Sequence, residues 1–250
     1  PAVVLLHSSA AGHRQWHKLM EELAGRYRLI AINLFGYGAT SKWPGKRPLT
    51  LADQAALVAA AADLDSGPVA IVGHSLGAAV ACEAALQLGS RVRTLAVFEP
   101  ILFYLLKDHH EEAAYADIET MSRGYFTHAQ RGDWQAVGHH FIDYWAGAGA
   151  WDAMPDERKA RVLPMLPPIA HEWDMLGIEG RPIEEWGKIA APVHLLYAAD
   201  TRLSTKRVTA LLRRAHPHWK FHELPTGGHL APIARPDLVN PLLTEILDGT

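Results

Sequence analysis

The strongest candidate for chemistry in this sequence is a serine between two glycines, where an apolar run passes into a helical pattern. Residues 69–79 read VAIVGHSLGAA and place Ser75 between Gly73 and Gly77. A nucleophilic serine at such a strand-to-helix turn has a strained backbone, and small neighbours avoid collisions with the adjacent strand and helix. Because a serine hydroxyl is a poor nucleophile at neutral pH, it needs an imidazole base and a carboxylate that orients the imidazole. The pattern therefore predicts covalent catalysis by Ser75.

The elements that must position this serine are short β-branched runs alternating with helical patterns. Strands are expected at residues 2–6, 29–32, 69–72, 94–98, 193–197 and 220–224. Helices are expected at residues 15–23, 51–64, 76–88, 206–215 and 237–247. Continuous apolar strands alternating with helices predict right-handed βαβ units, with helices on both faces of a mostly parallel sheet.

One region breaks this alternation. Residues 101–182 contain no convincing strand, and they are rich in Trp, Tyr, His and Met at helical spacing. Pro164, Pro167, Pro168 and Pro182 interrupt any long helix there, which predicts several short helices over the sheet rather than one bundle. We therefore expect a core formed by residues 1–100 and 183–250, with a helical cap formed by residues 101–182 inserted after the strand that ends near Phe98.

Several motifs resemble those of the α/β-hydrolase family. Besides the turn around Ser75, the segment HSSAAG at 7–12 looks like the family's oxyanion loop, and NLFGYGATS at 33–41 is similar to its D-x-x-G-x-G-x-S turn. Asp200 follows a strand where the family usually places its acid, and Gly227, Gly228 and His229 follow the last strand as its histidine loop does. The resemblance covers roughly residues 1–100 and 189–250. It implies an α/β fold with a sheet of about six to eight strands.

The resemblance implies a catalytic triad in which Ser75 is the nucleophile, His229 the general base and Asp200 the carboxylate that orients it. The competing acid is Glu99, at the end of the strand at 94–98, because some relatives take their carboxylate from that strand end. The resemblance also places the oxyanion donors at the backbone N–H groups of Leu76 and Ser9. Ser8 stands where the family usually has glycine.

Substrate selection is expected in the cap, whose large aromatic side chains are suited to cover an apolar group. The candidate substrate-binding residues are Tyr37, Phe103, Trp134, Phe141 and Trp145. The resemblance favours a carboxylesterase-like serine hydrolase for a substrate with an apolar acyl group. Carbon–carbon bond hydrolysis and cofactor-free perhydrolase activity share the same fold and triad, and a ligand receptor on a hydrolase scaffold is a further alternative.

Composition restricts the expected partners. The chain has 24 Lys plus Arg against 27 Asp plus Glu among 250 residues, without long blocks of either sign, so neither nucleic acid nor membrane is expected. The partner is a small-molecule substrate, with a homo-oligomer left open. The single Cys82 fits a reducing, cytoplasmic setting. No cofactor or metal is expected, because adjacent histidines such as those at 109–110 and 139–140 point in different directions on a helix.

Overall fold

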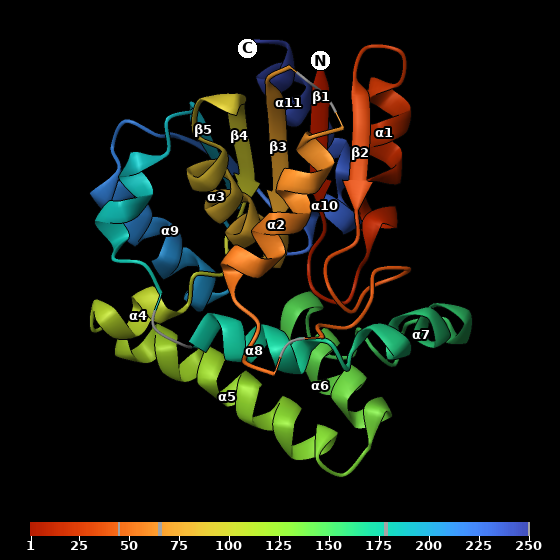
Figure 1. The fold of residues 1–250 in the computed structure, drawn as a ribbon. Helices are drawn as coiled ribbons and strands as arrows, with labels where there is room; N and C mark the ends of the chain where they lie inside the picture. The colour runs from red at the N-terminus through yellow and green to blue at the C-terminus, as the bar shows by residue number, and fades with distance from the viewer. Residues whose placement is uncertain (45, 65–66, 178–179, 250) are drawn as a thin grey trace.

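A computed structural model describes residues 1–44, 46–64, 67–177 and 180–249, and its centre is a parallel sheet of six strands (Figure 1). The strand order is β2-β1-β3-β4-β5-β6, and each neighbouring pair is parallel. The carboxyl ends of parallel strands meet at one edge, so residues that follow them are brought together there. The strands are β1 (Ala2–Leu6), β2 (Arg28–Ile32), β3 (Val69–His74), β4 (Val92–Phe98), β5 (Val193–Ala198) and β6 (Lys220–Leu224).

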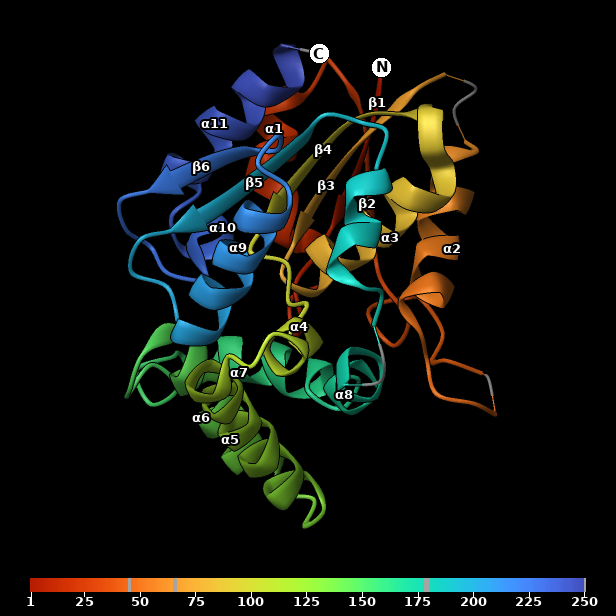
Figure 2. The ribbon, with the colours of Figure 1, turned by 90° about the vertical axis from the view of Figure 1, so that its left-hand side faces the viewer.

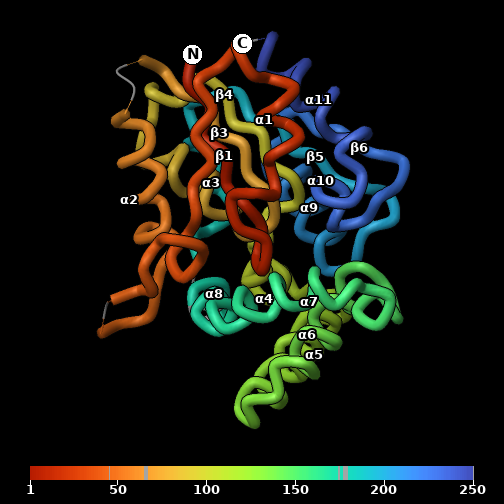
Figure 3. Tube along the Cα trace, turned by 90° about the vertical axis from the view of Figure 1, so that its right-hand side faces the viewer, coloured from red at the N-terminus to blue at the C-terminus, as the bar shows by residue number. Residues whose placement is uncertain are grey.

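Both faces of the sheet are covered, because its central strands are apolar on both sides. Along β1, Ala2, Val4 and Leu6 belong to one buried cluster, whereas Val3 and Leu5 belong to the other, as the two-residue period of a strand requires. The first cluster includes residues of α2 (Leu51–Ala62), α3 (Leu76–Leu88) and α9 (Leu203–Ala215). The second includes residues of α1 (His17–Leu23), α10 (Ala231–Ala234) and α11 (Pro236–Asp248). Figure 3 shows α1 and α11 together on their face.

The cap lies across the carboxyl edge of the sheet, at the end opposite the two chain termini (Figures 1 and 2). It contains α4 (Tyr104–Asp108), α5 (Glu112–Ala129), α6 (Trp134–Ala146), α7 (Asp156–Val162) and α8 (Ile169–Gly177), and a 3₁₀-helix η4 (Ile183–Lys188) leads back to β5. The prolines fall near helix boundaries, with Pro167 and Pro168 directly before α8. However, α5 has 18 residues and packs against α6, so the cap also contains one long helix that was not expected.

The helix boundaries differ from the sequence expectation mainly at their N-termini. The helix expected at 15–23 begins as a 3₁₀-helix η1 (His13–Trp16) and continues as α1. The helix expected from 206 begins at Leu203. In contrast, α2 begins where predicted, because Thr50 and Asp53 form a capping box that satisfies the free N–H groups there. Among the described helices, none is long and apolar enough to cross a membrane.

Candidate active site

Ser75 lies at the turn between β3 and α3 with an unusual backbone conformation. Its φ is 58° and its ψ is −115°, in a region that side chains disfavour. A Cβ on Gly77 would lie 2.4 Å from the carbonyl oxygen of Leu6, and a Cβ on Gly73 would lie 2.4 Å from that of Gly77. The Ser75 N–H donates to the carbonyl of Phe98 at 2.9 Å. Gly77 therefore lets the strained turn pack against the end of β1, and Gly73 lets β3 pack against the start of α3.

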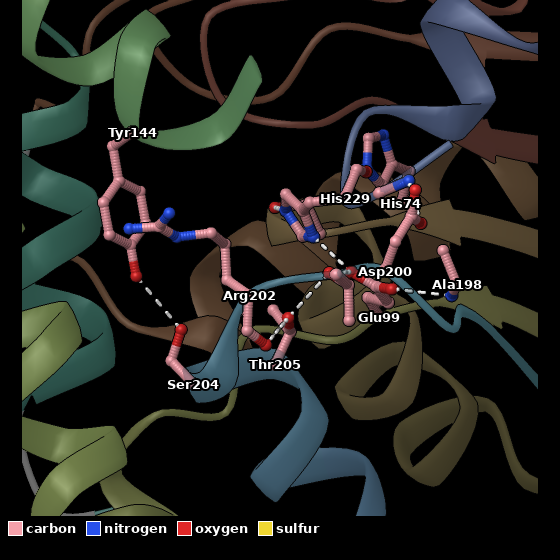
Figure 4. Close-up of polar contacts among 12 residues, drawn as sticks. His74, Glu99, Tyr144, Ala198, Asp200, Arg202, Ser204, Thr205 and His229 are labelled. Atoms are coloured by element: carbon pink, nitrogen blue, oxygen red, sulfur yellow. Dashed lines mark hydrogen bonds and ion pairs between the residues drawn. The ribbon is translucent and has the colours of Figure 1, made fainter. Parts of the chain in front are cut away.

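His229 connects Ser75 to a buried carboxylate. Its Nε2 lies 2.8 Å from Ser75 Oγ. Its Nδ1 lies 2.6 Å from Glu99 Oε2, and Figure 4 shows this pair. An ionised carboxylate can only accept, so Nδ1–H donates to Glu99, and this leaves Nε2 free to accept the serine proton. All three residues are buried, which excludes water from the hydrogen bonds.

Glu99 is held in place by further hydrogen bonds. It directly follows β4 with a φ of 46°, another strained position. Its Oε1 accepts from the backbone N–H of Ala198 at 2.9 Å (Figure 4), and its Oε2 accepts from Thr201 Oγ1 at 2.8 Å. These donors come from the end of β5 and the loop behind it. The carboxylate is thus fixed on the side of His229 that faces away from Ser75.

Asp200 does not occupy the position expected of the acid. The carboxylate that contacts His229 is Glu99, and the prediction that Asp200 does so is wrong. Asp200 instead accepts from the backbone N–H groups of Gly228 and Gly227 at 2.8 and 3.2 Å, and from Thr226 Oγ1 at 2.8 Å. Burial would raise the pKa of Asp200, but these hydrogen bonds lower it. The Asp200 side chain therefore stabilises the loop that carries His229.

His74 supports the same loop from the other side. Its Nδ1 lies 3.1 Å from Gln15 Nε2, and its Nε2 lies 2.8 Å from the backbone oxygen of His229. Because the amide of Gln15 donates, His74 must carry its proton on Nε2 and donate it to His229. Burial, followed by the charge of His229, lowers the pKa of His74 well below its ordinary value. His74 is therefore a neutral structural histidine.

His7 has a comparable role in the first loop. Its Nδ1 lies 2.7 Å from the Ser8 carbonyl oxygen, and its Nε2 accepts from the backbone N–H of Leu34 at 3.1 Å. Burial lowers the pKa of His7 to about 4. The ring therefore links the loops that follow β1 and β2 while staying uncharged near neutrality.

The two backbone N–H groups named as oxyanion donors are free of protein acceptors among the described residues. Leu76 is the first residue of α3, where N–H groups have no partner within the helix. The N–H of Ser8 is used by Gln15 Oε1 at 2.9 Å, which leaves the N–H of Ser9 as the available donor of that loop. Ser9 also lines the pocket that contains Ser75. This arrangement leaves both N–H groups available to a ligand.

A cavity of about 30 Å³ adjoins Ser75 and His229. Of the five candidate substrate-binding residues, Phe103, Phe141 and Trp145 line it, and the Trp145 ring centroid lies 4.2 Å from that of His229. Tyr37 and Trp134 are not part of its lining. Tyr37 is buried beneath the first loop, and Trp134 is the first residue of α6. Among the residues that the structure describes, the cavity is lined by Ser8, Ser9, Ser75, Ile101, Phe103, Met121, Phe141, Trp145, Ile169, Glu172, Trp173, Leu176, His229 and Leu230.

Sequence reasoning missed one polar side chain of this pocket, Glu172 in α8. It is 3% exposed and contacts the hydroxyl groups of Ser9 and Tyr37. Burial raises the pKa of Glu172 to about 7, although both hydroxyl groups act in the opposite direction. A signal was present, since Ile169, Glu172 and Leu176 are spaced at helical intervals on one stripe. A carboxyl group on an otherwise apolar stripe indicates a buried polar site.

A metal site is not apparent in the described part of the chain, which contains no group of three or more His, Cys, Asp or Glu side chains placed to hold an ion. His140 Nε2 lies 2.9 Å from the carbonyl oxygen of Met121, and exposed His139 lies near Asp143 and Asp152. Both histidines therefore have other contacts.

Comparison with known proteins agrees with the fold. The sequence profile of the Alpha/beta hydrolase family matches residues 3–242. The chain belongs to this family. Solved structures similar to this alpha/beta hydrolase include the enol-lactonase from Burkholderia xenovorans LB400, with a TM-score of 0.78 and 16% identity over 99% of this chain and 91% of that one. An alpha/beta hydrolase enzyme from a Medee basin deep-sea metagenome library has a TM-score of 0.80 and 17% identity, over 100% of this chain and 90% of that enzyme's chain.

Sequence relatives of this alpha/beta hydrolase carry several activities in their names. The pimeloyl-(acyl-carrier protein) methyl ester esterase of Edwardsiella ictaluri is 25% identical over 99% of this chain and 93% of the esterase. The haloalkane dehalogenase of Agrobacterium fabrum is 37% identical over 101 residues, which make up 40% of this chain. That match covers 33% of the dehalogenase, so it spans only about a third of that relative.

Proposed function

We propose that the protein is a serine hydrolase that cleaves carboxylic esters through an acyl-enzyme intermediate. The observation that carries this proposal is the buried chain of hydrogen bonds from Glu99 through His229 to Ser75, with contacts of 2.6 and 2.8 Å. Such a chain gives a serine the base it lacks and gives that base a fixed tautomer. The similarity to a methyl ester esterase over nearly the whole chain supports the same reaction.

In the first half of the proposed reaction, Ser75 Oγ attacks the ester carbonyl while His229 Nε2 takes its proton. The negative charge that develops on the carbonyl oxygen is stabilised by the N–H groups of Ser9 and Leu76, and Glu99 stabilises the imidazolium. The carbon–oxygen bond to the alcohol then breaks, and His229 returns the proton to the leaving alcohol. An acyl group remains bound to Ser75.

In the second half, water replaces the alcohol. His229 takes a proton from the water, whose oxygen attacks the acyl carbon. When the second tetrahedral intermediate collapses, the bond to Ser75 Oγ breaks and His229 returns the proton to the serine. The carboxylic acid leaves, and the residues are restored to their initial state.

The cavities indicate how an apolar substrate could be divided across the site. The space beside Ser75, of about 30 Å³, corresponds to roughly two water-sized spheres and accepts only a small group. A second cavity of about 310 Å³ shares Ser9, Phe141, Trp145 and Leu230 with the first. It is otherwise lined largely by Ala, Ile, Val and Met side chains. We therefore infer that one side of the ester is small and that the other is an apolar chain.

The proposal is tested by turnover of p-nitrophenyl acetate, butyrate and octanoate by the wild type, by Ser75→Ala and by the control Ser90→Ala. Ser90 is an exposed serine after α3. We expect turnover by the wild type and by Ser90→Ala, and a loss of at least about 10³-fold in kcat for Ser75→Ala. Equal rates for wild type and Ser75→Ala would refute the proposal.

A further inference from the structure

Glu172 joins three segments that surround the reaction site, although the reaction proposed above does not use it. One carboxylate oxygen contacts Ser9 Oγ in the loop after β1, and the other contacts the hydroxyl of Tyr37 in the loop after β2. Glu172 itself comes from cap helix α8. Glu172 and Tyr37 are 3% and 1% exposed, so water does not compete for these contacts.

The direction of one of these hydrogen bonds is fixed by a third group. The backbone N–H of Ala10 donates to the Tyr37 hydroxyl oxygen at 3.2 Å, and Glu172 Oε1 is the acceptor that the described residues offer to the Tyr37 hydroxyl hydrogen. Burial, together with the charge of Glu172, raises the pKa of Tyr37 well above its ordinary value and keeps that hydrogen in place. A proton on Oε1 would leave this buried hydrogen without an acceptor, so Oε1 accepts and a proton on Glu172 resides on Oε2.

The direction of the other hydrogen bond depends on the charge of Glu172. When the carboxyl group is ionised, Ser9 must donate its hydroxyl hydrogen to Oε2. When Oε2 carries a proton, it can donate to Ser9 Oγ, and the hydroxyl hydrogen of Ser9 is released to point elsewhere. Both states are accessible near neutrality, because burial raises the pKa of Glu172 to about 7. Ser9 lines the cavity that contains Ser75, so the released hydrogen can be directed to a substrate.

We propose that the Ser9 hydroxyl is a further hydrogen-bond donor to the ester carbonyl oxygen, and that Glu172 is the positioning residue that makes this hydrogen available when it carries a proton. This inference rests on the ester hydrolysis proposed above. Ionised Glu172 withdraws the donor and also places a negative charge in the pocket where the oxyanion develops. Both effects oppose the reaction.

The pH dependence of the reaction follows from these roles. The titratable groups that face Glu172 are Tyr37 below the first loop, Tyr125 on α5 and His229 across the cavity, and exposed His171 is its neighbour in α8. Burial raises the pKa of the Tyr125 hydroxyl well above its ordinary value, so this group stays protonated over the range of the assay. Ionisation of Glu172 therefore causes the activity to fall above about pH 7.

The decisive experiment is the pH profile of kcat/KM for p-nitrophenyl acetate with Glu172→Gln. The amide oxygen of glutamine accepts from Tyr37 and its NH₂ group donates to Ser9, so the variant imitates the protonated acid at every pH. We expect it to retain the activity of the wild type on the acidic side and to lose the decline above pH 7. The exposed Glu157→Gln on α7 is the matched control, and its profile should keep the decline.

Two further variants keep the test decisive if Glu172→Gln does not fold. Tyr37→Phe removes a hydrogen bond that lowers the pKa of Glu172, so the alkaline decline should move to higher pH. Ser9→Ala should lower kcat/KM on the acidic side by about tenfold, as expected for one lost neutral donor, and should flatten the decline.

Persistence of the wild-type decline in Glu172→Gln, or an unmoved decline in Tyr37→Phe, would overturn the role of Glu172. Ester turnover that depends on Ser75 would then still support the hydrolase. If the wild type turns over no ester at any pH, the hydrolase proposal fails and the role of Glu172 fails with it.

Discussion

Replacing Glu99 by glutamine should reverse the hydrogen bond that orients His229. The backbone N–H of Ala198 can only donate, so the amide oxygen takes the place of Oε1, and the NH₂ group takes the place of Oε2 beside His229 Nδ1. That group donates, which forces the imidazole to carry its proton on Nε2. In this tautomer Nε2 cannot accept the proton of Ser75, 2.8 Å away. The variant also leaves the imidazolium without its counter-charge.

The expected loss is large. Converting the equivalent carboxylate to an amide in a well-studied serine protease lowers kcat by about 10⁴-fold, or roughly 5.4 kcal/mol in the barrier. We expect a loss of this order for Glu99→Gln in steady-state turnover of p-nitrophenyl acetate. Glu99→Asp, which keeps the charge but shortens the side chain, should lose less. Asp200→Asn is the matched control, because it also neutralises a carboxylate near His229 while leaving Nδ1 bonded to Glu99. A larger loss for Asp200→Asn than for Glu99→Gln would refute the assignment.

Three further outcomes follow from individual contacts. Asp200→Asn should lower the thermal unfolding midpoint measured by circular dichroism, because it weakens the hydrogen bonds from the Gly227 and Gly228 N–H groups. An unchanged midpoint would contradict the role of Asp200 in stabilising the loop before His229. Gly77→Ala should lower the free energy of unfolding in urea by about 3 kcal/mol or more, because the added Cβ would meet the Leu6 carbonyl oxygen. An unfolding free energy equal to that of the wild type would show that the turn can relax. Hydrogen bonding to Arg47 lowers the pKa of Asp53 to about 2. The ionised Asp53 therefore stabilises the folded state above about pH 4, and this stabilisation is lost as the pH falls to 2. The difference in unfolding free energy between wild type and Asp53→Asn should therefore shrink over that interval, and a constant difference would argue against the ion pair.

The sheet and the nucleophile could be predicted from the sequence because both are local signals. Each strand is a short apolar run, and the turn at Ser75 requires small neighbours within two residues. The strands and the turn depend on residues that are adjacent in the chain, so no knowledge of the tertiary structure was needed for them. The histidine was assigned instead from the resemblance to the α/β-hydrolase family, whose histidine loop follows the last strand.

The acid could not be chosen from the sequence because two carboxylates follow adjacent strands. Glu99 comes directly after β4 and Asp200 comes two residues after β5, so both lie at the same edge of the sheet. Their roles are decided by the positive φ at Glu99 and by the path of the loop before His229. Neither feature has a local sequence signature.

The cap was the least predictable part. Trp134, Phe141 and Trp145 share α6, but only the last two reach the cavity, because Trp134 lies at the far end of the helix. Glu172 was overlooked because a single glutamate in a helix usually faces solvent. Its burial depends on the hydroxyl groups of Ser9 and Tyr37, which are distant in sequence.

The most direct test of the central claim is labelling with a fluorophosphonate probe, followed by peptide mapping. The probe reacts with a serine only when a base activates it. We predict a single adduct on Ser75 in the wild type, strongly reduced labelling in Glu99→Gln, and retained labelling in Asp200→Asn. Native, folded protein that gives no adduct on Ser75 would contradict the proposal that Glu99 and His229 activate this serine.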